Sequence, residues 1–218
     1  MNIYIVVEGE QEKKVYTSWI PIINPELSQI DFPNAASSNN FYIISGMGYP
    51  QYFEIIDNAI SDVNEFRLYD RLIISIDSED MTKDDKYNEV YRYIVGKACA
   101  ASIIIIVQHF CFETWALANK RFIRPEPRTE TLKMFKRVFN VRNNDPELLP
   151  PYPEKELNRA QFAKKYLSAA FNDRFKILSY NNGGTAIISH VKYFGQIKNR
   201  HISTNHIGSF SDFLTAFI

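Results

Sequence analysis

The sequence predicts an α/β protein built on an open, mostly parallel sheet with helices on its faces. Short runs of branched apolar residues, each of strand length, alternate with longer segments in which apolar residues recur at helical spacing. Two of these runs end abruptly in carboxylates, which is typical of buried parallel strands that deliver acids to a sheet edge. The predicted strands are residues 3–7, 41–44, 72–76 and 102–107, and the predicted helices between them are residues 11–20, residues 49–66 and a segment that follows residues 82–88 and ends near residue 100.

The first strand and helix form a predicted strand-turn-helix unit with Glu8 at the turn. The run Ile3–Val7 is apolar, and Val15 and Trp19 lie at i and i+4 on the inner face of the helix that follows. Gly9 allows the backbone to turn tightly between the two elements.

The later strands bring further candidates to the same edge of the sheet. The loop after the second strand contains Gly46 and Gly48, which suit either a close approach of the backbone to a phosphate or an ordinary strand-to-helix turn. The third strand leads into Asp77, and His109 follows the fourth. Because open α/β sheets bind ligands at the carboxyl ends of their strands, we expect Glu8, the glycine loop, Asp77 and His109 to share one edge.

A change in composition after residue 123 predicts a boundary. Six of the ten prolines fall between residues 125 and 153, on either side of a short basic helix predicted at residues 131–141. We therefore expect an α/β domain of residues 1–123, which ends with a helix at 112–122, and a basic, mainly helical extension of residues 124–218 that packs on it. Within the extension the pattern predicts helices at 157–171 and 209–218, a strand at 175–179 and a turn at 181–184, and leaves residues 186–194 without an assignment.

Length and composition indicate a globular protein with a good core. The chain has 218 residues, of which 45% are hydrophobic and 23% charged. No run approaches the roughly 20 apolar residues of a membrane span, and the N-terminus lacks a signal-peptide pattern, so we expect a cytoplasmic protein with no membrane partner. Cys99 and Cys111 lack the spacing of a zinc site and are expected to be buried free thiols.

The net charge of zero hides an uneven distribution. Residues 1–110 contain eight Lys and Arg against sixteen Asp and Glu, whereas residues 111–218 contain seventeen against nine. An acidic half that can hold metal is thus followed by a basic half that can hold phosphate. Chance segregation combined with attraction between the two parts is the alternative.

The acids after the first and third strands suit a hard divalent cation. Mg²⁺ and Mn²⁺ prefer oxygen ligands, and Mg²⁺ uses one or two carboxylates beside a substrate phosphate. Alternate side chains of an extended segment share a face, so Asp77 and Glu79 are expected to point together, with Glu8 as a third ligand if its strand is adjacent. The alternatives are a turn or capping role for Asp77 and a solvated helix-start carboxylate for Glu8.

Three patches, in this order along the chain, resemble a known family. The patches Val7-Glu8-Gly9-Glu10 and Asp77-Ser78-Glu79 resemble the two acidic motifs of the TOPRIM domain, which is shared by topoisomerases, bacterial primases and the OLD-type and RloB-like nucleases of phage defence. The segment from His109 to Leu117 is similar to the Cys-Phe-Glu-x-Trp segment of the RloB-like subgroup and points away from a topoisomerase. Glu79 stands where many members have Asp, so its ligand geometry differs.

The resemblance implies a metal-dependent nuclease that cleaves DNA or RNA. It implies that Glu8 acts as a general acid, a general base or a metal-site carboxylate, and that Asp77 and Glu79 hold one or two Mg²⁺ or Mn²⁺ ions. It also favours Glu113 in the acidic pocket, with a helix-start carboxylate as the alternative. The same resemblance implies an antiphage or abortive-infection effector that an ATPase partner holds silent. The sequence lacks a Walker-type loop, so the chain is not expected to hydrolyse ATP itself.

Basic side chains in the second half are the candidates for nucleic-acid binding. Positive groups interleaved with aromatic residues suit backbone contact and base stacking, although basic helices also form ordinary solvated faces. His109 could be a general acid or a phosphate donor, or a neutral hydrogen-bonded residue. The binding candidates are Lys120, Arg121, Lys192, Lys198 and Arg200.

Two rival functions remain open at this point. The fold could serve as a non-catalytic adaptor that binds a partner ATPase or nucleic acid, with the carboxylates merely ending strands. It could also be a hydrolase of small phosphate esters, for which a closed pocket would be expected in place of an open basic groove.

Overall fold

The chain folds into two compact units. The computed structural model describes residues 1–46, 48, 51–175, 179–180 and 183–218. The first unit contains residues 1–76, 84–107 and 212–218, and the second contains residues 77–83 and 108–211. The sequence predicted a boundary between residues 123 and 124. In the structure the long segment of the second unit begins at residue 108, and residues 212–218 belong to the first unit.

The first unit is organised around a five-stranded, all-parallel sheet, which confirms the predicted fold class. The strand order is β2-β3-β1-β4-β5. Strand β1 pairs with β3 on one side and with β4 on the other, with Val6 opposite Ile44 and Ile74. The strands are β1 (Ile3–Val7), β2 (Ser28–Gln29), β3 (Asn40–Ser45), β4 (Arg71–Asp77) and β5 (Ser102–Gln108).

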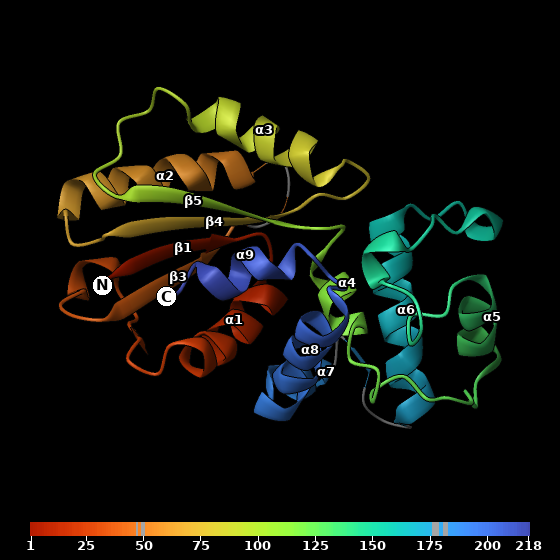
Figure 1. The fold of residues 1–218 in the computed structure, drawn as a ribbon. Helices are drawn as coiled ribbons and strands as arrows, with labels where there is room; N and C mark the ends of the chain where they lie inside the picture. The colour runs from red at the N-terminus through yellow and green to blue at the C-terminus, as the bar shows by residue number, and fades with distance from the viewer. Residues whose placement is uncertain (47, 49–50, 176–178, 181–182) are drawn as a thin grey trace. The chain divides into compact units, whose positions relative to one another are not determined.

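Helices cover both faces of this sheet. Helices α2 (Tyr52–Phe66) and α3 (Lys83–Ile94) lie on one face, and α1 (Glu10–Ile23) lies on the other (Figure 1). The chain leaves β1 towards β3 and leaves β4 towards β5, so the sheet has its topological switch point between β1 and β4. Ligands of such sheets bind at the carboxyl ends of the strands beside that point.

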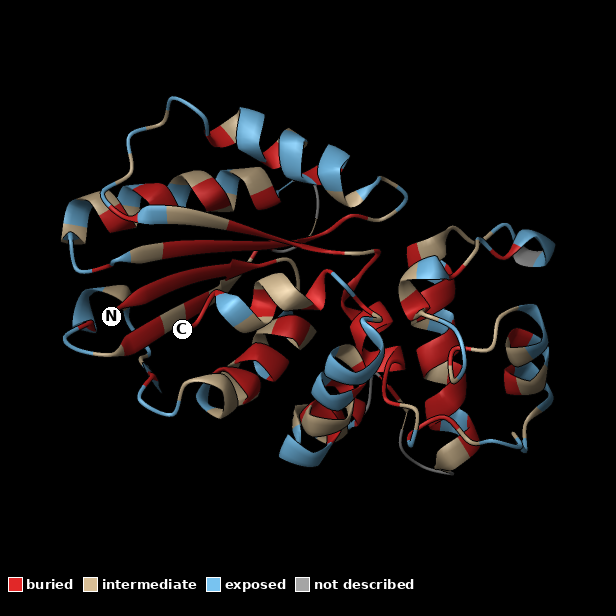
Figure 2. Ribbon diagram, in the orientation of Figure 1, coloured by how far each residue is buried: buried red, intermediate tan, exposed pale blue. Residues whose placement is uncertain are grey.

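The alternation of side chains along β1 and β4 explains why both faces are apolar. Tyr4 and Val6 of β1 join the α2 and α3 side of the core, together with every second residue of β4. On the other face, Tyr16 of α1 is fully buried and its hydroxyl lies 2.8 Å from Oγ of Ser75. Trp19 packs edge to face on Phe213, which belongs to the same unit, with ring centroids 6.0 Å apart. Figure 2 shows the central strands as buried.

A few helices and strands of the structure begin or end at residues other than those predicted. Helix α1 continues to Ile23 through Pro21, which removes one backbone donor but does not stop the last turn. Strand β2 has two exposed residues and no hydrophobic pattern, so nothing in the sequence marks it. The helix predicted from residue 49 begins at Tyr52, and residues 49–50 lie outside the described part of the chain.

The described residues of the glycine loop support a turn more than a phosphate cradle. The backbone N–H of Gly46 donates to the carbonyl of Val7 at 2.6 Å, and that of Gly48 donates to the carbonyl of Glu8 at 3.2 Å. These donors hold the loop against the turn after β1. Residue 47 and residues 49–50 lie outside the described part.

The second unit is helical throughout its described residues, apart from short turns and isolated bridges. The strand predicted at 175–179 and the turn at 181–184 fall largely on residues outside the described part, and the unassigned stretch 186–194 belongs to two helices. No helix in the described chain combines the length and apolar character needed to cross a membrane. The helices are α4 (Phe112–Leu117), α5 (Glu130–Val138), α6 (Arg159–Arg174), α7 (Gly184–Ser189) and α8 (Val191–Thr204), and α9 (Phe210–Thr215) is divided between the units after residue 211.

Aromatic side chains form much of the core of the second unit. Phe135 of α5 packs against Phe162 of α6 with ring centroids 5.1 Å apart and against Tyr166 at 5.8 Å. Further along α6, Phe171 packs against Phe122 at 4.6 Å. Since aromatic side chains bury large areas, these contacts hold α5 and the segment after α4 on α6.

We predict that Gly46→Ala destabilises the first unit by about 1–3 kcal/mol, the usual cost of overpacking a core. An added methyl group at Gly46 would overlap the ring of Tyr52, which is fully buried and donates its hydroxyl to the carbonyl of Ser75 at 2.8 Å. Urea unfolding followed by tryptophan fluorescence measures the change.

Gly9→Ala is the matched control for this prediction. Gly9 has φ −132°, which any residue adopts, and an added Cβ would lie 3.4 Å from the Glu12 carboxylate. We expect Gly9→Ala to lower the free energy of unfolding by less than about 1 kcal/mol, which is the scale of a weakened helix cap. If the two variants lose equal free energy of unfolding, the Tyr52 ring does not prevent a methyl group at position 46.

Candidate metal centre

Asp77 ends β4 and is held by the start of α4. Its side chain is 5% exposed, and Oδ1 accepts a hydrogen bond of 3.0 Å from the backbone N–H of Phe112. Oδ2 lies 3.6 Å from Nζ of Lys164 in α6. One carboxylate oxygen therefore caps a helix while the other faces a cation.

The turn after β4 is bonded to the segment that follows β5. The backbone N–H of Ser78 donates to the carbonyl of Gln108 at 2.9 Å, and that of Glu79 donates to the carbonyl of Phe110 at 2.8 Å. Glu79 has φ 53°, in the left-handed region, so the chain turns there. Its carboxylate is partly exposed, and Oε1 lies 3.4 Å from Nζ of Lys164.

Glu113 lies in the first turn of α4, next to Asp77 and Cys111. Carboxylate oxygens of Asp77 and Glu113 and the sulfur of Cys111 all lie within 4.8 Å of one another. Glu113 is 8% exposed, and Oε1 accepts a hydrogen bond of 2.8 Å from the hydroxyl of Tyr180. The structure thus brings Glu113 to Asp77, as one of the two sequence-based alternatives expected.

Cys111 is a thiol in this environment. Complete burial raises the pKa of Cys111 well above its ordinary value, and the neighbouring carboxylates of Glu113 and Asp77 add to the increase. The sulfur therefore carries no charge near neutral pH, and the charged donors of the cluster are oxygens.

Lys164 is the residue of this cluster that the sequence did not reveal. Burial alone would lower the pKa of Lys164, but Asp77, Glu113 and Glu79 together raise it above its ordinary value. The ammonium group therefore stays charged over the physiological range. Helix α6 is itself tied to the turn after β4, because the backbone N–H of Arg159 donates to Asp80 at 3.2 Å.

Glu8 follows β1 in the first unit. The pairing of Val6 with Ile74 puts Glu8 level with Ile76, one residue before Asp77, so Glu8 and Asp77 stand at the carboxyl ends of neighbouring strands. The side chain of Glu12 reaches back to the backbone N–H of Gly9 at 2.7 Å and satisfies this donor at the start of α1. Glu12 thus has the structural role at the helix start.

His109 is held as a neutral residue. Its Nδ1 lies 2.8 Å from Oγ of Ser78, and burial lowers the pKa of His109, with Arg159 and Lys83 acting in the same direction. These contacts favour the neutral, hydrogen-bonded alternative over a general acid.

The nucleic-acid-binding candidates differ in exposure. Arg121, Lys192 and Lys198 are exposed, and Lys120 is half-buried. Arg200 is 3% exposed and donates to the carbonyls of Ala118 at 3.2 Å and Asn144 at 2.6 Å. Burial lowers the pKa of Arg200 to about 10, against the opposite effect of Asp145. Arg200 therefore joins segments of the second unit. Contact of the five candidate residues with nucleic acid stays a prediction.

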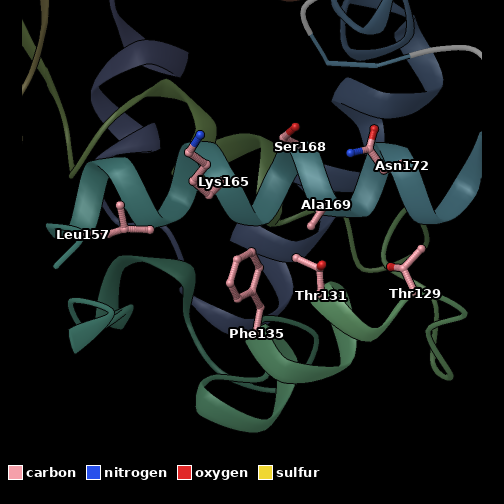
Figure 3. Close-up of a pocket in the computed structure, with 8 residues that line it drawn as sticks. All are labelled: Thr129, Thr131, Phe135, Leu157, Lys165, Ser168, Ala169 and Asn172. Atoms are coloured by element: carbon pink, nitrogen blue, oxygen red, sulfur yellow. The ribbon is translucent and has the colours of Figure 1, made fainter. Parts of the chain in front are cut away.

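Two cavities lie within the second unit, away from the carboxylates. The first, of about 500 Å³, lies between α5 and α6, where Phe135 points towards Ala169 (Figure 3), and its lining also includes Thr131, Ser168 and Asn172. The second, of about 670 Å³, is bounded by the segment after α4, the end of α6 and helices α7 and α8. Neither cavity is lined by Asp77, Glu79 or Glu113.

Comparison of the chain with models of protein families, with curated proteins and with solved structures finds no match.

We predict that Lys164→Met raises the affinity of the protein for Mn²⁺ by at least about tenfold, which corresponds to about 1.4 kcal/mol. The ammonium group lies 3.4–3.6 Å from carboxylates of Glu79 and Asp77 and competes there with a divalent cation. Isothermal titration calorimetry with Mn²⁺ measures the change. Lys165→Met, on the exposed face of the same helix, is the control and should leave the affinity unchanged. Equal affinities for the Lys164 variant and the wild type would place the ion elsewhere.

A second prediction concerns Glu147, which helps to hold α4. Glu147 accepts hydrogen bonds from the backbone N–H of Ser209 at 3.1 Å and from its hydroxyl. The same hydroxyl accepts a bond of 2.7 Å from the indole N–H of Trp115 in α4. Burial raises the pKa of Glu147 to about 7, although the hydrogen bonds from Ser209 lower it in part.

Since the pKa of Glu147 is higher in the folded state than in the unfolded one, folding favours the protonated form. Its contribution to stability is complete below the unfolded value of 4.5 and is lost as the pH rises through about 7. Glu147→Gln should therefore match the wild type at low pH and exceed its free energy of unfolding by about 2 kcal/mol above pH 7. Urea unfolding of both proteins from below pH 4.5 to above pH 7 tests this prediction, with the exposed Glu126→Gln as control. A difference in free energy of unfolding that does not grow with pH would contradict it.

Proposed function

We propose that the protein is a metal-dependent nuclease that cleaves phosphodiester bonds in DNA or RNA. The observation that carries the proposal is the group of carboxylates Asp77, Glu79 and Glu113 around Lys164, at the carboxyl end of a strand beside the switch point of the sheet. Reactions of open α/β sheets take place at this edge.

The donor set fits Mg²⁺ or Mn²⁺. Oxygen atoms of Asp77 and Glu113 lie within 4.8 Å of each other, a separation that one ion can bridge with ligand distances of about 2.0–2.6 Å. The third member of this group is the neutral thiol of Cys111, so the charged donors are hard oxygens. In the proposal Asp77, Glu113 and Glu79 hold the ion, which when bound polarises the phosphate and activates a water molecule.

Two further residues complete the proposed site. Lys164 remains charged near neutral pH and can donate to a phosphate oxygen once a cation has taken its place between the carboxylates. Glu8 is proposed as the general acid or base, because it ends the strand next to that of Asp77. The second unit supplies positive charge, with eighteen Lys and Arg against eleven Asp and Glu in residues 77–83 and 108–211.

The biological role is proposed from the resemblance to RloB-like nucleases alone. It is that of an antiphage or abortive-infection effector that works with a partner ATPase.

A non-catalytic adaptor is the second candidate, and specific contacts favour it. Asp77 caps the start of α4 through Phe112, and Glu113 accepts from Tyr180, so both acids already have structural roles. A hydrolase of small phosphate esters is the third candidate, and it would need a closed pocket at these acids.

We predict Mg²⁺- or Mn²⁺-dependent cleavage of single-stranded or duplex DNA or RNA by the purified protein. Asp77→Asn and Glu8→Gln should each lower the rate by at least about 100-fold, because each removes a group that acts in the reaction. The measurement is a time course on end-labelled substrates with and without EDTA.

The matched controls change the same residue types outside the site. Glu10→Gln and Asp84→Asn alter exposed carboxylates and should cleave like the wild type. Cleavage that survives Asp77→Asn and Glu8→Gln would refute the assignment of the site. If the wild type cleaves none of the substrates, even with a candidate ATPase added, the adaptor becomes the better explanation.

A further inference from the structure

A groove in the second unit gathers positive charge, amide groups and an apolar wall. It has a volume of about 670 Å³, within the usual range of ligand pockets. Its lining comes from the segment after α4, from the end of α6 and from α7 and α8. No carboxylate is present among the described residues that line it.

Three permanent cations line the groove. The guanidinium of Arg174 is held in place, since Nη2 donates to the carbonyl of Arg121 at 2.9 Å and the group lies over the ring of Phe122 at 5.4 Å. The charged ends of Arg121 and Lys192 make no ion pair or hydrogen bond with any described residue. Like charges gathered without a counter-ion raise the free energy of the folded protein, and a bound anion would offset this cost.

Amide groups supply neutral donors and acceptors beside these cations. Asn119 is 4% exposed, and its carbonyl oxygen accepts from the backbone N–H groups of Arg121 and Phe122, each at 3.1 Å. No hydrogen bond joins its NH₂ group to a described residue, so this donor can serve a ligand in the groove. Gln196 and Asn199 line the groove from the same face of α8 as Lys192, at i+4 and i+7.

The remaining lining combines small or aliphatic residues with aromatic rings. Ala186 and Ile187 of α7 and Gly195 of α8 contribute the first kind, and Phe122, His190 and Tyr193 contribute the rings. A Cβ added at Gly195 would meet nothing within 4 Å, so the groove is open above this position. An apolar surface of this kind accepts the flat face of an aromatic base, while the amides can reach its edge.

We propose that this groove binds a nucleotide of a single-stranded nucleic acid, with the phosphate on Arg121, Arg174 and Lys192 and the base against α7 and α8. The proposal rests on the proposed function and specifies its substrate class. In a duplex the base edges are paired and stacked, so donors inside a concave groove can reach only an unpaired base. The planar guanidinium of an Arg side chain also suits the bidentate recognition of a phosphate.

The test measures binding without catalysis. Fluorescence anisotropy of labelled 12-nucleotide DNA and RNA strands is recorded in EDTA, with the corresponding duplexes alongside. Arg121→Ala/Lys192→Ala should weaken single-strand binding by at least about tenfold and lower the slope of log K against log salt by about 1.4, the value for two lost phosphate contacts. Lys14→Ala/Arg92→Ala makes the same charge change at exposed sites of the first unit and should bind like the wild type.

A second pair of variants tests the position of the ligand. Gly195→Glu places a carboxylate in the open part of the groove and should weaken binding at least about tenfold. Gly195→Ala adds one methyl group to a helix interior, so it should bind within about twofold of the wild type and melt at a higher temperature. A thermal melt of each variant shows that loss of binding is not loss of folding.

The outcomes separate this inference from the proposed nuclease. Cleavage by the wild type combined with unchanged binding in both groove variants would overturn the groove and leave the nuclease intact. Groove-dependent binding without cleavage would support the groove and count against the nuclease. Equal binding of duplex and single strands, or binding of a free mononucleotide as tight as that of a strand, would overturn the proposal of an unpaired nucleotide within a strand.

Discussion

Hydrogen bonds between residues 77–79 and residues 108–112 hold the candidate centre together. The backbone N–H groups of Ser78 and Glu79 bond to the chain after β5, and the carboxylate of Asp77 accepts from the start of α4. Because these bonds set the path of both segments, they also set the separation of Asp77 and Glu113. The same bonds leave the second oxygen of Asp77 directed at Lys164. Asp77 thus ends a strand, caps a helix and faces a cation. Because these contacts suit a structural role as well as a chemical one, the nuclease proposal and the adaptor proposal rest on the same residues.

The sequence predicted the sheet well because buried parallel strands have a strong local signature. Apolar runs marked β1, β3, β4 and β5, and the acids that follow two of these runs marked Glu8 and Asp77. It could not mark β2, whose two exposed residues bury nothing. Lys164 was also hidden, because it meets Glu79 across 85 positions of the chain, and no local pattern separates it from Lys165 on the outer face of α6. The environment of Arg200 was hidden for another reason: a basic residue on a helix predicts a solvated face, but this one is buried and donates to carbonyl groups.

Gly46 and Gly195 have different surroundings and therefore different structural roles. The sequence context of Gly46 suited either a phosphate loop or an ordinary turn, and the structure shows that this glycine leaves room for the buried ring of Tyr52. Gly195 has open space where a side chain would be, and it contributes to the groove by leaving it wide. Composition alone cannot distinguish these cases, because the difference lies in what surrounds the missing side chain.

The division of the chain has a consequence for how the protein is made. Residues 212–218 belong to the first unit, where Arg71 donates to the carbonyls of Ala216 at 2.8 Å and Ile218 at 2.9 Å, and Asn24 donates to that of Phe217 at 2.9 Å. Domains commonly fold from the N-terminus onwards as the ribosome extends the chain. Here all five strands are synthesised by Gln108, but the segment that packs on Trp19 and bonds to Arg71 is synthesised only after the basic helical unit. The first unit therefore stays incomplete while that unit emerges, and the apolar surface around Trp19 stays uncovered during that interval.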